Sequence, residues 1–189
     1  MMYTRNTAKG KYTVPQTGFC IFIDADSFPS ASRDLIIRMA QKRQWQCCFA
    51  ANRPLPIKSD PSIRMVIVPA GKNMADRYIG FHASIYDIVL TRDILLAERL
   101  VKNNITVINH LGEIFDQGNI AERRSVRDFS FHAHQYGLIK PSQGKSDYGQ
   151  KELAHLANSL DRMMSVLMKK KPMLKEKQND SKRRSRCDF

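Results

Sequence analysis

The chain has 189 residues, of which 42% are hydrophobic and 26% are charged. This composition is typical of one soluble globular domain with its own core. No apolar run reaches the roughly 18 residues that a membrane-spanning helix needs, and residues 1–17 lack the apolar stretch of a secretory signal. We therefore expect a cytoplasmic protein that does not enter a membrane.

The net charge of +13 is concentrated in two terminal segments. Residues 1–17 hold basic but no acidic side chains, and residues 169–189 hold nine basic side chains against three acidic ones. We expect both segments to be disordered extensions of one folded domain that spans residues 18–168. The C-terminal tail either contacts nucleic-acid phosphates or only aids solubility, and its composition leaves both open.

The four cysteines are Cys20, Cys47, Cys48 and Cys187. None forms a C-x-x-C pair, and no His lies at a zinc-finger distance from them. The first three fall inside apolar, strand-like runs, which predicts buried, reduced thiols.

The first half of the domain begins with a continuous apolar run at residues 19–23 that stops at Asp24. Such a run predicts a strand buried on both faces of a parallel sheet. Apolar residues at helical spacing then predict a helix over 29–44. Further strands are predicted over 46–51 and 64–68.

The second half of the domain continues the alternation of helices and strands and ends with two further helices. These elements are predicted over residues 73–84, 85–90, 94–103, 105–108, 117–136 and 148–168. Strands that alternate with helices of this length predict an α/β fold with a doubly wound, mostly parallel five-stranded sheet and extra C-terminal helices.

Polar side chains follow the predicted strands, where open parallel sheets bind their ligands. These side chains are Asp24, Asp26, Asn52, Asp76, Thr91, Asp93 and Asn109. Carboxylates that converge on one edge repel one another unless a cation or protons intervene. The four aspartates therefore predict a site for Mg²⁺ or Mn²⁺, which prefer oxygen ligands.

Each aspartate also has a structural interpretation. Asp26 fits a cap of the helix that begins near Pro29. Asp76 and Asp93 fit acids of a first helical turn, which the helix dipole favours. Asp87, at the amino end of its strand, is interpreted as structural. The coincidence of several acids on one edge favours the metal site.

Several separated segments resemble, in the same order, the YaiI/YqxD family of uncharacterised bacterial proteins. Residues 23–29 read Ile-Asp-Ala-Asp-Ser-Phe-Pro, and residues 50–55 read Ala-Ala-Asn-Arg-Pro-Leu. Further matches lie at residues 75–76, 87–97, 112–113, 119–120, 127–129 and 157–162. The resemblance covers roughly residues 18–168.

That family is similar in turn to the PIN/NYN nuclease-like superfamily, so the resemblance implies a PIN-like fold. The likeness rests on Asp24, on the helix start that holds Asp76, and on Thr91, Arg92 and Asp93. In active members, acids at these places bind Mg²⁺ or Mn²⁺ for phosphodiester hydrolysis. The resemblance thus implies that the three aspartates are catalytic, with the second Asp of the first motif as an auxiliary metal ligand.

Substrate contacts are expected from side chains next to the strand ends. They are Asn52, Arg53, Lys72, Thr91, Arg92 and Asn109. The expected partner is RNA or single-stranded DNA, whose phosphates need positive charge close to the acidic edge. Arg92 stands where the family usually has a small residue, so it would either reach a phosphate or block the site. No protein partner is identifiable from the sequence.

Two other functions stay open at this point. The Asp-Ala-Asp stretch also resembles the D-x-D motif of haloacid-dehalogenase-like phosphatases, with Asp24 as nucleophile and Asp26 as general acid. Phe28 stands where that family has Thr or Val, which disfavours this interpretation. The domain could also be a non-catalytic nucleic-acid-binding module that uses its basic tails.

Overall fold

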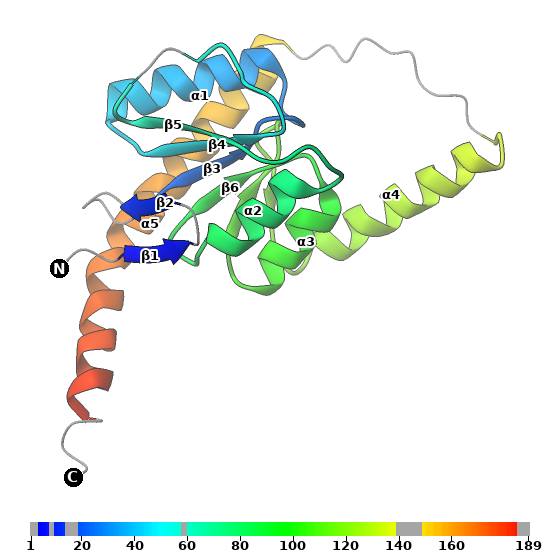
Figure 1. Cartoon of the computed structure of the whole chain (residues 1–189). Helices are drawn as coiled ribbons and strands as arrows, with labels where there is room; N and C mark the ends of the chain where they lie inside the picture. The colour runs from blue at the N-terminus through cyan, green and yellow to red at the C-terminus, as the bar shows by residue number, and fades with distance from the viewer. Residues whose placement is uncertain (1–3, 8–9, 14–18, 58–59, 139–148, 185–189) are drawn as a thin grey trace.

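The computed structural model describes residues 4–7, 10–13, 19–57, 60–138 and 149–184. Within these ranges one larger sheet is surrounded by helices (Figure 1). Its strands are β3 (Ile21–Asp24), β4 (Cys47–Ala51), β5 (Ile63–Ile67), β6 (Ile88–Leu90), β7 (Thr106–Ile108) and β8 (Ile114–Phe115). The helices are α1 (Ser30–Arg43), α2 (Met74–His82), α3 (Ile94–Lys102), α4 (Ile120–Gln135) and α5 (Gln150–Arg184).

The larger sheet has the strand order β5-β4-β3-β6-β7-β8, and its neighbours are parallel except for β7 with β8. The prediction of a doubly wound, mostly parallel sheet is confirmed. The five predicted strands are all present, and β8 adds an antiparallel sixth. The sequence did not reveal β8 because two residues are too few to show a strand period.

The strand order reverses at β3. From β3 the chain moves outward to β4 and β5, and it then returns to the other side of β3 to form β6 and β7. In doubly wound sheets such a reversal opens a crevice at the carboxyl ends of the two central strands. Here that switch point lies where β3 and β6 end.

Helices cover both faces of the sheet, and alternate side chains of β3 reach opposite faces. Ile21 and Ile23 belong to the core that α1 and α5 complete. Phe22 belongs to the core that α2 and α3 complete. The strand is thus buried on both faces, as its continuous apolar run predicts, and its end point is fixed by packing from both sides (Figure 1).

The predicted disorder of the two terminal segments and the predicted domain boundary at residue 168 stay predictions, and the described part of each segment contains secondary structure. Strands β1 (Thr4–Thr7) and β2 (Gly10–Thr13) form an antiparallel pair inside the segment 1–17. Helix α5 continues to Arg184, beyond the predicted domain boundary at residue 168. Thr and Tyr favour strands, and Lys, Glu, Leu and Met favour helices, although Pro172 lies inside α5 and opposes a helix at that point.

The cysteines of the described chain are free thiols, as the sequence predicts. Cys20, Cys47 and Cys48 are buried, and burial raises the pKa of Cys47 and of Cys48. Cys187 lies outside the described residues. Because a raised pKa keeps a thiol protonated, Cys47 and Cys48 act as small apolar side chains of the sheet.

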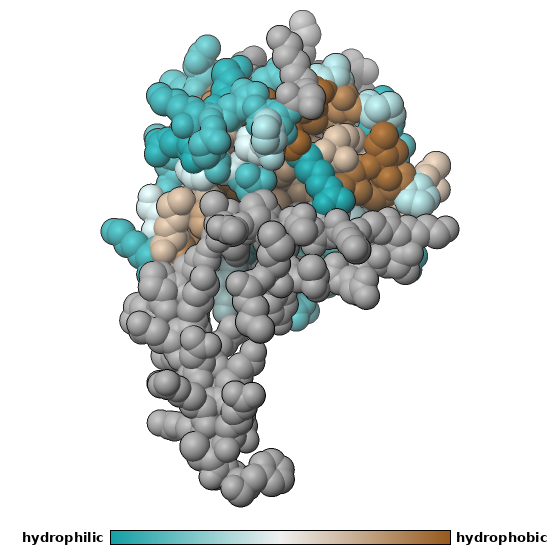
Figure 2. Space-filling model, turned by 60° about the vertical axis from the view of Figure 1, so that its left-hand side comes forward, coloured by the Kyte–Doolittle hydropathy of each residue, from teal (hydrophilic) through white to brown (hydrophobic). Residues whose placement is uncertain are grey.

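The surface mixes polar and apolar side chains, and Figure 2 shows one face on which apolar side chains gather beside a large polar area. In the part of the chain that the structure describes, large exposed hydrophobic residues include Ile67, Phe81 and Ile85. No helix in that part combines the length and the apolar character needed to cross a membrane.

Gly112 provides a test of how α5 is held. It lies in the turn between β7 and β8 with a φ of +83°, and a Cβ there would lie 2.7 Å from backbone atoms of His155 and Leu156 in α5. We expect Gly112→Ala to lower the free energy of unfolding by about 1–3 kcal/mol in urea denaturation. The control Gly80→Ala, in open space on α2, should raise it by about 0.5–1 kcal/mol. Equal stability of Gly112→Ala and wild type would contradict the close approach of α5 to this turn.

Candidate functional site at the carboxyl edge of the sheet

Asp24 is the last residue of β3 and lies at the switch point of the sheet. It is 4% exposed, and its Oδ2 accepts a hydrogen bond of 2.8 Å from the hydroxyl of Thr91. Thr91 follows β6 directly and is fully buried. The bond therefore joins the ends of the two central strands and fixes the orientation of the Asp24 carboxylate.

Asp93 stands at the start of α3 and is its N-cap. Its Oδ1 accepts hydrogen bonds from the backbone N–H groups of Leu95 at 2.7 Å and Leu96 at 3.3 Å. Its own N–H donates to Thr91 Oγ1 at 3.0 Å. Asp93 therefore has a structural role as the N-cap of α3, not as an acid of its first turn, and the cap uses Oδ1 alone.

Asp76 lies in the first turn of α2 and is buried. Burial is the main cause that raises the pKa of Asp76 from 3.8 to about 6. The negative charges of Asp24 and Asp93 raise it further, as does a side-chain hydrogen bond with Asp93, while the charge of Arg99 lowers it. These interactions mean that α2 and α3 bring Asp76 and Asp93 into contact, with Asp24 close enough to repel them.

The pKa of Asp24 is also raised, chiefly because burial disfavours the charged carboxylate. Hydrogen bonds from Ser27 and Thr91 act in the opposite direction, and the charge of Asp26 adds a small increase. Two of the three buried or half-buried aspartates at this edge thus hold their protons more tightly than a free carboxyl does. A cation bound between them would relieve the same repulsion.

Asp26 does not cap α1. The N-cap position of that helix is Pro29, which makes no side-chain cap. Asp26 is exposed, and its Oδ2 instead accepts a hydrogen bond of 2.8 Å from the backbone N–H of Asn52. It therefore ties the loop after β3 to the loop after β4, at the carboxyl edge of the sheet.

The carboxylates at this edge are few for a metal site made by protein side chains alone. Within the described ranges, no group of three or more His, Cys, Asp or Glu side chains is arranged to hold a metal. Mg²⁺, however, is commonly held by one or two carboxylates, with waters and substrate phosphate in the remaining positions. The hydrogen-bonded pair Asp76 and Asp93 fits that smaller requirement, and the pKa of Asp76 is raised first by burial and then by the neighbouring negative charges.

Asn109, expected to contact substrate, has its side chain engaged in the turn that joins β7 to β8. Its Nδ2 donates to Glu113 Oε2 at 2.9 Å, and its Oδ1 accepts from the backbone N–H groups of Leu111 and Glu113. Asn109 therefore stabilises this turn in the structure, and its contact with substrate stays a prediction.

The other expected substrate-binding side chains differ in accessibility. Thr91 is buried behind Asp24, whereas Asn52, Arg53, Lys72 and Arg92 are exposed. The Arg92 guanidinium lies 3.4 Å from the backbone carbonyl oxygen of Ser27. The exposed basic side chains follow β4, β5 and β6, which places them around the same edge as the acids.

Two residues of the site escaped the sequence analysis. Ser27 donates from its hydroxyl to the Asp24 carbonyl oxygen at 3.1 Å and holds the turn after β3. Arg99, on α3, stabilises the charged form of Asp76. Ser27 could have been found from its place in the Asp-Ala-Asp-Ser motif. Arg99 gave no sequence signal, because its contact depends on how α3 packs beside α2.

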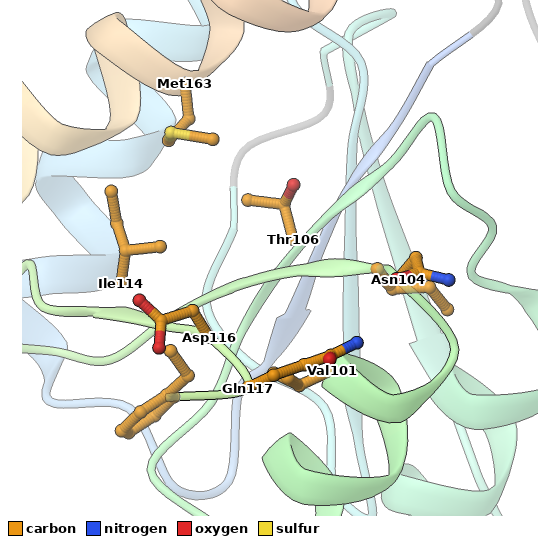
Figure 3. Close-up of a pocket in the computed structure, with 9 residues that line it drawn as sticks. Val101, Asn104, Thr106, Ile114, Asp116, Gln117 and Met163 are labelled. Carbon is orange, nitrogen blue, oxygen red and sulfur yellow. The ribbon is translucent and has the colours of Figure 1, made fainter. Parts of the chain in front are cut away.

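A shallow cavity of about 210 Å³ lies elsewhere, between the amino end of β7, β8 and α5 (Figure 3). Ile114, Met163 and Val101 contribute apolar walls. Its acid, Asp116, accepts hydrogen bonds through Oδ1 from the N–H groups of Gly118 and Asn119, which places it in the turn before α4. The cavity is thus separate from the acidic edge, and its one carboxylate has a structural role.

The fold and this edge define a doubly wound α/β protein with an acidic cluster at its topological switch point. The sequence model of the family described as "Uncharacterized BCR, YaiI/YqxD family" matches residues 22–166. The chain belongs to that family, and the resemblance stated from its motifs is confirmed.

Relatives with the same coverage support this assignment. A UPF0178 protein of Psychromonas ingrahamii is 38% identical over 149 residues, which cover 79% of this chain and 97% of the relative. A UPF0178 protein of Treponema pallidum is also 38% identical over 149 residues, covering 79% of this chain and 83% of the relative. No solved structure matches the chain. None of these names states a reaction.

The raised pKa of Asp76 makes stability depend on pH. Between pH 3.8 and about pH 6 the unfolded chain loses this proton before the folded protein does, so stability falls as pH rises through that window. Asp76→Asn should remove this decrease of stability with rising pH. Without metal it should also raise the free energy of unfolding at pH 8 by about 1–2 kcal/mol. Urea denaturation at several pH values in EDTA measures both effects.

The matched control for that variant is Asp87→Asn, at the opposite end of the sheet. Asp87 accepts hydrogen bonds from the N–H groups of Cys20 and Ser84 and from the Ser84 hydroxyl. Its replacement should therefore lower stability at pH 8. If Asp76→Asn lowers stability as Asp87→Asn does, Asp76 has a supporting role and the repulsion argument is wrong.

Proposed function

We propose that this protein is a metal-dependent phosphodiesterase that cleaves RNA or single-stranded DNA at the carboxyl edge of its sheet. The observation that carries the proposal is the mutual contact of Asp76 and Asp93 beside Asp24, with the pKa of Asp76 raised to about 6. Strongly perturbed carboxylates in a crevice are characteristic of functional sites. Their position at the switch point is where doubly wound proteins bind phosphate-bearing ligands.

Asp76 and Asp93 would hold Mg²⁺ or Mn²⁺ directly, while Asp24 beside them and Asp26 at the rim would act on the ion through its bound waters. Such an ion supplies activation of water and stabilisation of developing phosphoryl charge. Thr91 orients Asp24 by its 2.8 Å hydrogen bond, and the cap bonds of Asp93 fix the position of its carboxylate. These contacts hold the acids in place before substrate arrives, which lowers the entropy cost of assembling the site.

The basic rim supports a polyanionic substrate. Arg53, Lys72 and Arg92 are exposed around the acidic edge, and each can meet a phosphate while the acids face the reacting bond. Without such charges the edge would repel a nucleic-acid backbone. The likeness to the PIN/NYN superfamily points to the same substrate class. As part of this proposal the protein acts in the cytoplasm, which its free, buried thiols support.

The first test measures metal binding and cleavage together. Wild type should bind Mn²⁺ in calorimetry and cleave single-stranded RNA or DNA only when Mn²⁺ or Mg²⁺ is present. Asp93→Asn should keep the fold, because Asn is as good an N-cap as Asp, yet it should lose about 100-fold or more in cleavage rate. Asp24→Asn should weaken Mn²⁺ binding.

The control for both variants is Asp34→Asn, which replaces an exposed acid on α1 and should leave binding and cleavage unchanged. Cleavage that survives Asp93→Asn would assign the activity to another site or to a contaminant. Binding of RNA without cleavage under any of these metals would replace the enzyme by a nucleic-acid-binding module.

The second test concerns the basic rim. The double variant Arg53→Ala with Lys72→Ala should weaken RNA binding and reduce the slope of log affinity against log salt by about 1.4, or about 0.7 for each phosphate contact on a single strand. The control removes two exposed charges from α1, Arg38→Ala with Lys42→Ala. Fluorescence anisotropy of a labelled single strand at several salt concentrations gives both values. Equal loss in the two variants would mean that net charge alone drives binding.

A further inference from the structure

Helix α4 leaves the body of the protein and presents aromatic side chains to solvent. Figure 1 shows α4 extending away from the sheet, with its distal end clear of the other helices. Phe129 is 69% exposed, Phe131 61%, Tyr136 74% and Leu138, just beyond the helix, 77%. We call residues 129–138 the α4 arm.

The arm is unlike the rest of α4. The first turns of the helix are fixed to the body by ion pairs, Arg123 with Glu113 at 2.9 Å and Arg124 with Glu98. Residues 129–138 contain no Lys, Arg, Asp or Glu. Several large exposed aromatic side chains on one short element mark an interaction site.

The charges near the arm disfavour nucleic acid as its partner. Arg123, Arg124 and Arg127, the basic residues at its base, are all paired with acids; Arg127 contacts Asp128 at 3.0 Å. Aromatic platforms for single strands combine stacking with a positively charged groove that follows the phosphates. The arm has the aromatic part of that combination and lacks the unpaired charge.

The chain that follows the arm does not offer enough apolar surface to cover it. Residues 139–148 contain Ile139 and Tyr148 as their large hydrophobic residues. Phe129 and Phe131 are two positions apart, and at about 100° per residue they point to opposite sides of the helix. Covering both requires an occupant that contacts the arm on two sides.

We propose that the arm is the interface of a homodimer, in which each α4 arm inserts into the second copy of this chain. Whole aromatic side chains bury about 150–250 Å² each, so the exposed parts of the arm amount to on the order of 500 Å² per copy. Two copies together reach the roughly 1,000 Å² that a specific interface needs. A two-fold pair uses the same surface twice, which suits an arm without Lys, Arg, Asp or Glu side chains.

Sedimentation analysis of the full chain over a wide range of concentration tests this inference. Wild type should form a dimer. Phe129→Asp and Phe131→Asp, made singly, should each raise the dimer dissociation constant about tenfold or more. Both side chains are exposed in the monomer, so circular dichroism should show unchanged folding. The matched control is Phe81→Asp, an aromatic residue on α2 that is 76% exposed, and it should remain a dimer.

Three results would overturn the inference. Wild type could sediment as a monomer at every concentration, or Phe81→Asp could dissociate the dimer while the arm variants keep it. The arm variants could also keep the oligomeric state of wild type and lose affinity for single-stranded RNA in anisotropy, which would assign the arm to nucleic acid. None of these results depends on whether the acidic edge is catalytic.

Discussion

The position of β3 is the constraint on which the rest of the structure depends. The strand is hydrogen-bonded to β4 on one side and to β6 on the other, and its side chains fill the cores on both faces of the sheet. It therefore cannot shift by one residue without exchanging the two cores. Because β3 ends at Asp24, this packing places a carboxylate at the switch point whatever its cost in repulsion.

The acids at the edge are held by interactions that oppose their mutual repulsion. Thr91 donates to Asp24, backbone N–H groups of α3 donate to Asp93, and Arg99 lies close enough to favour the charged form of Asp76. Without metal these interactions do not cancel the effects of burial and of the neighbouring acids, so the pKa of Asp76 stays raised. The buried, mutually repelling acids therefore lower the stability that the two cores provide. Such a loss is common where a binding site is already organised before its ligand arrives.

Much of this arrangement could be predicted from the sequence, because strand ends are visible in it. The abrupt change from Ile23 to Asp24, and from Leu90 to Thr91, marks where two buried strands stop. The sequence could not show which side-chain atoms of these polar residues already make hydrogen bonds within the protein. Asp26 contacts Asn52 across two loops, and Asn109 is engaged in a turn with Glu113. Such contacts depend on loop geometry, which has no period in the sequence.

Helix α3 connects the two features that are proposed here, and it also keeps them separable. Its first residue follows Asp93, and Glu98 on its outer side pairs with Arg124 at the base of α4. Buried Leu96 and Leu100 fix the helix against the sheet. A substitution on the distal part of α4 leaves that packing unchanged, because it lies beyond the ion pairs that hold the helix base. The proposed dimerisation and the proposed metal chemistry should therefore be separable by substitution, and an effect of one on the other would have to pass through movement of α3 itself.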